Sequence, residues 1–264
     1  MEQCSMSILK INSGPRGYFQ DRLPQQSQPS ELANINWSAA ISRNLQFVTS
    51  HRVGIRRFGK ILASSVYSGN AGLQSYGAWR GYRISGNSAD HVRFDTGLTS
   101  AGSDPCTVEF LVVASSYPSL AALGGLSAEG YTNGAIGGGG GCRAVLSFGG
   151  SAPCNMYYYG GGADYDSGVP FTVNTVQHIF AMKFAGATTP SLSIWRNGKQ
   201  IILGGSGGNF GTSGPYFYLG ARYTSGAATI DGIIVKAAFY DTILTATEIA
   251  SLTANQWQQF EDTQ

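Results

Sequence analysis

The chain has 264 residues and a formal net charge of +2, with 37 glycines, 12% aromatic residues and only 12% charged residues. This composition describes many short strands joined by tight turns, and it argues against a bundle of amphipathic helices. No apolar run reaches the 18 residues that a membrane helix needs. All-β sandwiches of this length commonly form one domain, so we expect a single core.

Residues 1–30 are polar and interrupted by prolines at positions 15, 24 and 29. They have too little apolar periodicity to bury a face. The sequence therefore predicts an extended N-terminal arm over residues 1–30 and a sandwich over residues 31–264. The first strands of that sandwich are expected at residues 35–37 and 45–48.

Positive charge is concentrated near the start of the chain. The first 60 residues hold eight Lys or Arg against three Asp or Glu, and residues 51–60 contain no acid. This segment could dock onto an acidic protein surface, form a solvated strand face or bind nucleic acid. We expect protein docking and no nucleic acid, because the net charge of the chain is small. The docking candidates are Arg16, Arg22, Arg52, Arg56, Arg57 and Lys60.

Runs of β-branched and aromatic residues predict strands at residues 217–219 and 230–240, and one helix follows them. Asn197 and Gly198 suit the tight turn of a hairpin. Thr245 and Glu248 have the spacing of a capping box, which predicts a helix over residues 246–253. We expect the following apolar residues to be buried against the strands: Leu244, Ile249, Leu252, Trp257 and Phe260.

Residues 217–252 resemble the C-terminal signature of laminin-G-like, concanavalin A-like jelly-roll domains, which consists of strand, loop, strand and capped helix. Upstream segments look like the successive strands of the same family, in the correct order, at residues 81–84, 90–95, 107–113, 177–184 and 192–199. The tail at residues 254–260, Ala-Asn-Gln-Trp-Gln-Gln-Phe, is similar to the ending of such domains from tailed bacteriophages. The resemblance implies an all-β, concanavalin A-like (laminin-G-like) jelly-roll β-sandwich with an extended N-terminal arm and a short C-terminal helix.

The same resemblance implies a structural virion protein, made in the cytoplasm of the bacterial host. We expect a capsid decoration or a component of a head or tail fibre, anchored by its N-terminal arm. Its partners would be other virion proteins, and we expect a homo-oligomer. Sparse surface charge favours packing within such an assembly.

The alternative function is a carbohydrate-binding adhesion module that recognises host surface glycans. Sugar sites combine aromatic faces with amide and carboxylate groups. The candidates are Tyr157, Tyr158, Tyr159, Asp164, Tyr165, Asp166 and Asn209. Asp164 and Asp166, expected in a Gly-rich loop, could also hold calcium. In a third interpretation the tyrosines of a strand fill the core and the acids cap a turn. The sequence leaves these three interpretations open.

The strand at residues 232–240 departs from the family pattern, in which an acid often lies beside the Gly-x-Ile motif. Its interior is apolar apart from Lys236, although Asp231 and Asp241 flank it. This departure weakens the prediction of lectin activity more than the prediction of the fold.

Enzymatic activity is not expected. Retaining glycan hydrolysis needs two carboxyl groups about 5 Å apart, and the Glu-x-Asp-x-x-Glu run that places them on one strand is absent from the sequence. The runs at residues 137–141 and 204–208 match phosphate-loop and nucleophile patterns only through their glycines. We therefore predict no catalytic residues.

The four cysteines, Cys4, Cys106, Cys142 and Cys154, lack the spacing of a zinc site. Because the chain has no signal peptide, we expect isolated buried thiols in a reducing cytoplasm. A bridge between Cys142 and Cys154 across a hairpin stays open. The sequence thus predicts neither a metal nor another cofactor.

Overall fold

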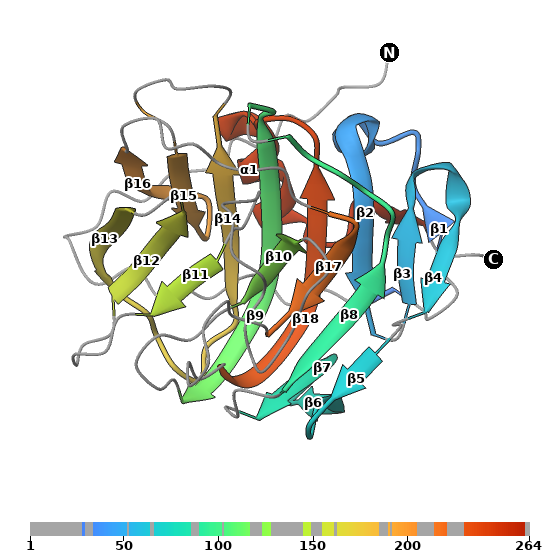
Figure 1. The fold of residues 1–264 in the computed structure, drawn as a ribbon, viewed down its shortest axis with the longest axis horizontal. Coiled ribbons are helices and arrows are strands. Elements are labelled where there is room, and N and C mark those ends of the chain that lie inside the picture. Colours follow the sequence, from blue (N-terminus) through green and yellow to red (C-terminus); the bar gives the residue numbers. More distant parts are fainter. Residues whose placement is uncertain are drawn as a thin grey trace, which may run out of the picture.

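The computed structural model forms two main β-sheets that pack face to face (Figure 1). The structure describes residues 28–29, 34–51, 53–63, 66–85, 90–101, 103–116, 123–127, 145–148, 155–160, 163–184, 190, 192–204, 214–220 and 230–261. In this part of the chain, no helix is long and apolar enough to cross a membrane. The all-β jelly-roll class predicted from the sequence is confirmed.

The large sheet runs across the molecule from β16 to β4. Its order is β16 (Lys199–Gly204), β15 (Leu192–Arg196), β14 (Gln177–Lys183), β9 (Cys106–Ser116), β18 (Asp231–Tyr240), β2 (Leu45–Ser50), β3 (Val53–Arg56) and β4 (Ile61–Ala63). A hairpin of β6 (Gly72–Tyr76) and β7 (Trp79–Ser85) joins this sheet through β18.

The smaller sheets lie beside or in front of the large one in Figure 1. One has the order β10 (Gly124–Ser127), β17 (Tyr216–Leu219), β8 (His91–Asp95) and β5 (Val66–Ser68). Another contains β11 (Val145–Phe148), β12 (Asn155–Gly160) and β13 (Ala163–Pro170). The short strands β1 (Asn34–Ile35) and β19 (Phe260–Glu261) pair near the ends of the chain. Two 3-10 helices, η1 (Ala40–Asn44) and η2 (Arg57–Gly59), flank β2 and β3.

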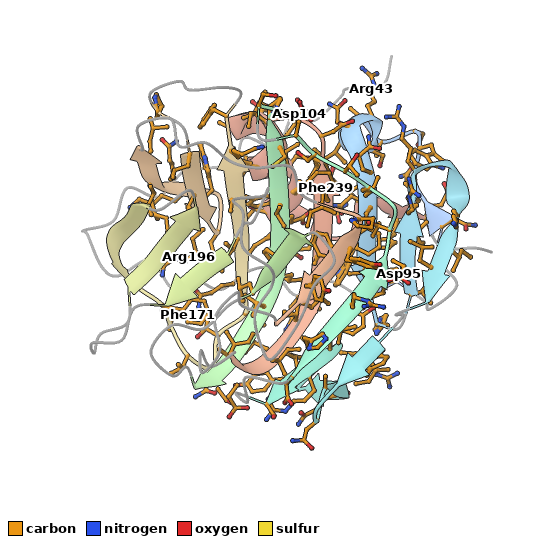
Figure 2. The ribbon with its side chains drawn as sticks, in the orientation of Figure 1. Arg43, Asp95, Asp104, Phe171, Arg196 and Phe239 are labelled. Atoms are coloured by element: carbon orange, nitrogen blue, oxygen red, sulfur yellow. The ribbon has the colours of Figure 1, made fainter. Side chains whose placement is uncertain are left out.

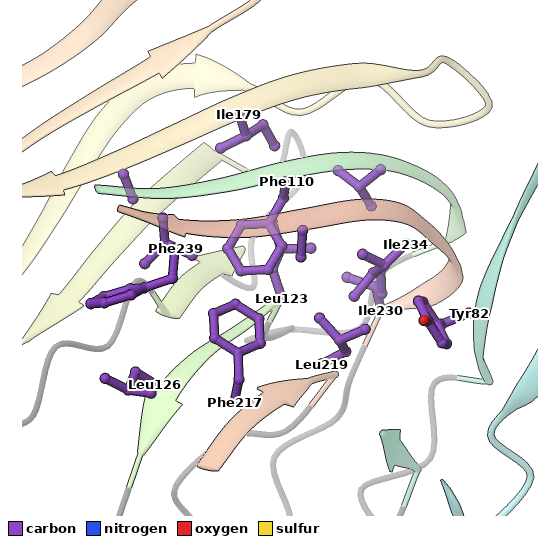
Figure 3. Close-up of a cluster of buried hydrophobic side chains, with 14 of the residues drawn as sticks. Tyr82, Phe110, Leu123, Leu126, Ile179, Phe217, Leu219, Ile230, Ile234 and Phe239 are labelled. Atoms are coloured by element: carbon purple, nitrogen blue, oxygen red, sulfur yellow. The ribbon is translucent and has the colours of Figure 1, made fainter. Parts of the chain in front are cut away.

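Alternation along the strands gives the large sheet two buried faces. Its inner face meets the four-stranded sheet, where Phe110 of β9 and Phe217 of β17 lie 6.5 Å apart between ring centres (Figure 3). Phe47 joins this cluster, with its ring 5.1 Å from that of Phe217. The outer face of the large sheet carries the C-terminal helix and tail. A sandwich core therefore forms on one face and a second apolar layer on the other.

The C-terminal helix α1 (Ala246–Ala254) forms as the sequence predicts. Thr245 accepts a hydrogen bond from the Glu248 backbone, and the Glu248 carboxylate accepts one from the Thr245 backbone, so the capping box is present. Leu244, Ile249, Leu252 and Trp257 are buried, whereas Phe260 is half-buried. Four of the five predicted contacts are thus confirmed. Phe260 is less enclosed because β19 pairs only with the two-residue strand β1.

The N-terminal arm predicted over residues 1–30 falls almost wholly outside the described residues. Gln28 and Pro29 are described, and Pro29 is buried. The Gln28 side chain donates to the Arg80 carbonyl at 2.9 Å and accepts from the Arg80 amide at 2.6 Å. Strand β18 pairs with β7 only as far as Tyr82, and Gln28 satisfies the β7 backbone just beyond that point. Gln28 and Pro29 of the predicted arm therefore contact the sandwich.

Two expectations from the sequence are wrong. Asp164 and Asp166 lie on strand β13, not in a loop. Pairing of β13 with β12 begins already at Ala163, opposite Gly160, so both aspartates are part of the hairpin. Cys106 is buried and forms a disulfide, so the expectation of isolated thiols does not hold for it. The other cysteines, Cys4, Cys142 and Cys154, lie outside the described residues.

Trp257→Ala should lower the free energy of unfolding by about 3 to 5 kcal/mol, because the ring is 6% exposed and packs 6.4 Å from the ring of Trp79. Trp37→Ala is the matched control, since Trp37 is 44% exposed and its loss should change stability by about 0.5 kcal/mol or less. Denaturant unfolding of both variants measures this difference. Equal stability of the two variants would contradict the role given to the tail.

Candidate functional site

A cluster of ionisable groups lies at the centre of the large sheet, on its outer face. Glu109 of β9 forms an ion pair with Lys236 of β18 and a hydrogen bond with His178 of β14, and all three side chains are fully buried. The distance from Glu109 Oε1 to His178 Nε2 is 2.6 Å. A carboxylate and a lysine in such surroundings are stable only when both are paired and hydrogen-bonded.

A β-bulge brings Lys236 to this face. The register of β18 against β9 shifts between Ile234 and Lys236, so Val235 is the extra residue. Val235 and Lys236 consequently both lie on the outer face, whereas Ile234 and Ala237 contribute to the inner core.

The C-terminal tail seals the cluster. Lys236 Nζ donates to the Gln256 carbonyl and, at 3.1 Å, to Gln259 Oε1. The second oxygen of Glu109 accepts from Gln259 Nε2 at 2.8 Å and from the Tyr240 hydroxyl at 2.7 Å. Lys236 Nζ also lies 5.7 Å from the centre of the Trp257 ring. The tail residues therefore complete the polar contacts of both buried charges.

The electrostatics of the cluster favour a charged Glu109. Burial alone would raise its pKa, but Lys236 and His178 outweigh that effect and hold the pKa of Glu109 at about 2. Burial lowers the pKa of both His178 and Lys236, against the attraction of Glu109. Because solvent reaches none of the three side chains, the cluster offers no surface to a substrate.

A solvent-open pocket of about 300 Å³ lies at one end of the sandwich, and we call it the rim pocket. It forms where β2 begins, where β18 ends and where the chain leads from β8 into β9. Figure 2 labels two of its residues, Asp104 and Phe239, in the upper part of the molecule, beside the start of β9 and the end of β18. The complete lining is Gln46, Leu98, Thr99, Ser100, Asp104, Pro105, Phe239 and Asp241.

Hydrogen bonds hold the polar groups of the rim pocket in place. Gln46 Nε2 donates to Asp241 Oδ2 at 2.7 Å, and Asp104 Oδ2 accepts from the Ala101 amide at 2.7 Å. Behind this loop, Lys183 Nζ donates to the Ala101 carbonyl at 2.9 Å. Burial lowers the pKa of Lys183 to about 8 against the pull of Asp104, and burial raises the pKa of Asp241. The pocket thus presents two carboxylates and an amide beside apolar side chains.

The tyrosine-rich candidates lie on the β12–β13 hairpin. Tyr157 pairs with Asp166, Tyr158 with Tyr165, and Tyr159 with Asp164. By alternation, the two aspartate positions share a face of the hairpin with Tyr157 and Tyr159, and Tyr158 shares the opposite face with Tyr165. The backbone therefore groups four of the six positions on one face of the hairpin and the other two on the opposite face. Asn209 lies outside the described residues.

The basic docking candidates are only partly described. Arg56 ends β3, Arg57 begins η2 and Lys60 follows it, so these three lie together at one side of the large sheet. Residues 51–60, for which a solvated strand face is one interpretation, contain one described strand, β3, which η2 follows. Arg16, Arg22 and Arg52 lie outside the described residues.

Sequence reasoning missed the rim pocket. Its residues come from positions 46, 98–105 and 239–241, and no local pattern connects them. The sequence feature that pointed toward this pocket was Asp241, an acid at the end of a strand whose interior lacks the acid that family members often carry. Within the described part of the chain, no group of three or more His, Cys, Asp or Glu side chains could hold a metal ion.

Comparison with known families identifies residues 85–250 as a match to the concanavalin A-like lectin/glucanases superfamily. The chain belongs to this superfamily. The match runs from the end of β7 into α1, so the tail that seals Glu109 and Lys236 lies beyond it. A search of curated protein sequences found no match.

Solved structures with the concanavalin A-like fold are similar in shape but distant in sequence. A Trypanosoma rangeli sialidase in complex with 2,3-difluorosialic acid is 16% identical, with a TM-score of 0.57, and the match covers 89% of this chain and 37% of the sialidase. The binding domain of botulinum neurotoxin serotype G is 12% identical, with a TM-score of 0.51, and the match covers 81% of this chain and 51% of that domain. The chain thus spans little more than a third of the sialidase that it matches.

Lys236→Met should destabilise the fold by about 3 to 5 kcal/mol, because it leaves the Glu109 carboxylate buried without its cation. The double variant Glu109→Leu, Lys236→Met should recover most of that loss, because it removes both charges. Denaturant unfolding of the two variants and of Glu109→Leu alone gives the coupling free energy. If the double variant is no more stable than Lys236→Met, Lys236 is not the main partner of Glu109.

Proposed function

We propose that this chain is a non-enzymatic binding domain that recognises carbohydrate and is carried on the particle of a tailed bacteriophage. The observation that carries the binding part is the rim pocket, in which Gln46, Asp104 and Asp241 line an open hollow beside the half-buried apolar residues Leu98 and Pro105. Sugars need hydrogen-bond acceptors for their hydroxyl groups and apolar surface for their C–H faces, and this pocket offers both.

Two further observations support carbohydrate as the ligand. The superfamily description includes lectins, and the similar sialidase was solved with a sialic acid derivative. The Gln46–Asp241 hydrogen bond also fixes the orientation of the amide, so its carbonyl oxygen stays available as an acceptor. A preformed polar arrangement lowers the entropy lost when a ligand binds.

The particle setting rests on the sequence. The tail at residues 254–260 is similar to the ending of phage domains of this type. Sparse charge and several exposed apolar side chains, including Ile61 and Leu203, suit a protein that packs against neighbours. Glycan binding and a role on a particle surface are compatible, because an exposed decoration or fibre can contact the host envelope.

Gln46→Ala and Asp104→Ala should each weaken glycan binding at least tenfold, because each removes a polar group from the rim pocket. The matched controls are Gln74→Ala and Asp95→Ala, which change an exposed amide and an exposed carboxylate outside that pocket. A glycan array followed by titration of the retained glycans provides the measurement, with unfolding midpoints to check that all variants are folded.

The same array distinguishes the rim pocket from the tyrosine hairpin. Tyr158→Ala and Asp164→Ala should leave binding intact if the rim pocket is the site. Loss of binding in these variants alone would move the site to the hairpin and overturn the rim-pocket assignment. Release of reducing sugar by the wild-type protein would overturn the non-enzymatic assignment.

Deleting residues 1–27 should leave a folded sandwich that no longer associates with its particle, because Gln28 and Pro29 keep their contacts with the sheet. Mass spectrometry of purified particles that carry the full-length or shortened chain measures occupancy. Full occupancy of the shortened chain would contradict the arm as the anchor. Absence of the full-length chain from the particles would contradict the virion proposal itself.

A further inference from the structure

In the described part of the chain, β4 is the last strand at one end of the large sheet, at the right of Figure 1, and its outer side is an open edge there. Among the described strands, β4 pairs only with β3. The Arg56 amide donates to the Lys60 carbonyl at 2.9 Å, which makes this a hydrogen-bonded pair in the register that aligns Ile55 with Ile61. Because such pairs alternate in antiparallel sheets, the N–H and C=O groups of Ile61 and Ala63 point away from β3, toward the open side.

An apolar row ends at this edge. Val48 of β2 pairs with Ile55 of β3, and Ile55 pairs with Ile61 of β4. Their exposures are 0%, 3% and 61% in that order, so the row passes from the core to the solvent within three strands. A further strand beside β4 would continue the row with an apolar side chain and cover Ile61.

The opposite face of the same edge is basic. Gly54 faces the inner core near Phe47 and Phe94, and alternation places Arg56 and Lys60 on that same side. Arg56 is half-buried and Lys60 is exposed. In the part of the chain that the structure describes, neither forms a salt bridge, and the enclosed Nε of Arg56 has no hydrogen-bond partner. The segment at residues 51–60 contains no acid, and its Arg57 interacts electrostatically with Asp241.

We propose that β4 is a docking edge for an extended acidic segment of another protein, which adds to the large sheet as a new strand. Its backbone would pair with Ile61 and Ala63, an apolar side chain would lie beside Ile61, and acidic side chains on the other face would approach Arg56 and Lys60. Strand addition gives affinity through backbone hydrogen bonds and selectivity through alternate side chains. Charge complementarity selects an acidic partner over a second copy of this edge, which would bring like charges together. This proposal is independent of the glycan site.

The test uses an eight-residue peptide of alternating glutamate and valine, with blocked ends, and the isotope-labelled full-length protein. We expect chemical-shift changes centred on residues 60–63 and binding that weakens at least threefold in 0.5 M salt, because exposed charges are screened. A peptide with the same composition in two blocks, and one of alternating lysine and valine, should bind at least tenfold more weakly.

Three variants make the assignment specific. Ala63→Pro removes an outward N–H but keeps the pairing of Leu62 with Gly54, and it should weaken peptide binding at least tenfold. Lys60→Glu should do the same by reversing a charge. Leu203→Lys is the control on the opposite edge strand β16, where Leu203 is 56% exposed, and it should change binding less than twofold. Unchanged unfolding midpoints establish that the variants are folded.

Several outcomes would overturn the proposal. These are shift changes located away from β4, equal binding of the lysine peptide, or equal binding by the Ala63→Pro variant. Preferential binding of a single-stranded thymidine oligonucleotide to Arg56 and Lys60 would replace the protein partner with nucleic acid. Concentration-dependent dimerisation that Ala63→Pro abolishes would replace it with a second copy of the chain.

Discussion

The buried ion pair between Glu109 and Lys236 constrains the outer face of this sandwich more than any apolar contact does. Removing two such charges from water costs several kcal/mol for each ion, and their mutual attraction offsets this only with further hydrogen bonds. The tail supplies those bonds through the Gln256 carbonyl and the Gln259 side chain. Gln256, Trp257 and Gln259 are consequently part of the core. Trp257 and Leu252 pack around the polar centre that the tail completes.

The sequence predicts those parts of the fold that depend on local residue patterns, and it misses those that depend on how distant strands pair. The run of β-branched and aromatic residues locates β18, and the order of the family's strands locates β9 and β14. The capping box locates α1 through local backbone chemistry. The bulge at Val235 has no such signal. Strict alternation would have placed Val235 and Lys236 on opposite faces, and only the pairing of β18 with β9 reveals the shift.

The candidate sites were predicted less completely, because they too depend on how distant strands pair. The tyrosines and aspartates of β12 and β13 are near in sequence, so their proximity was visible, although the boundary between loop and strand was not. Gln46, Asp104 and Asp241 are far apart in sequence and meet only because β2, β9 and β18 are neighbours in the sheet. A pocket made by sheet order cannot be found before the order is known. The disulfide of Cys106 likewise depends on tertiary proximity.

Strand β18 connects the three features that matter for function. Its inner residues Ile234, Ala237 and Phe239 build the sandwich core, and its bulge directs Lys236 to the tail on the other face. Its end supplies Asp241 to the rim pocket, and its pairing with β2 fixes the side of the sheet that leads to the open edge at β4. Because one strand bears on all of these features, a substitution in β18 changes stability and binding together. Substitutions on β4, or in the loop that carries Asp104, separate the two effects, since they lie outside the contacts of the buried charge pair.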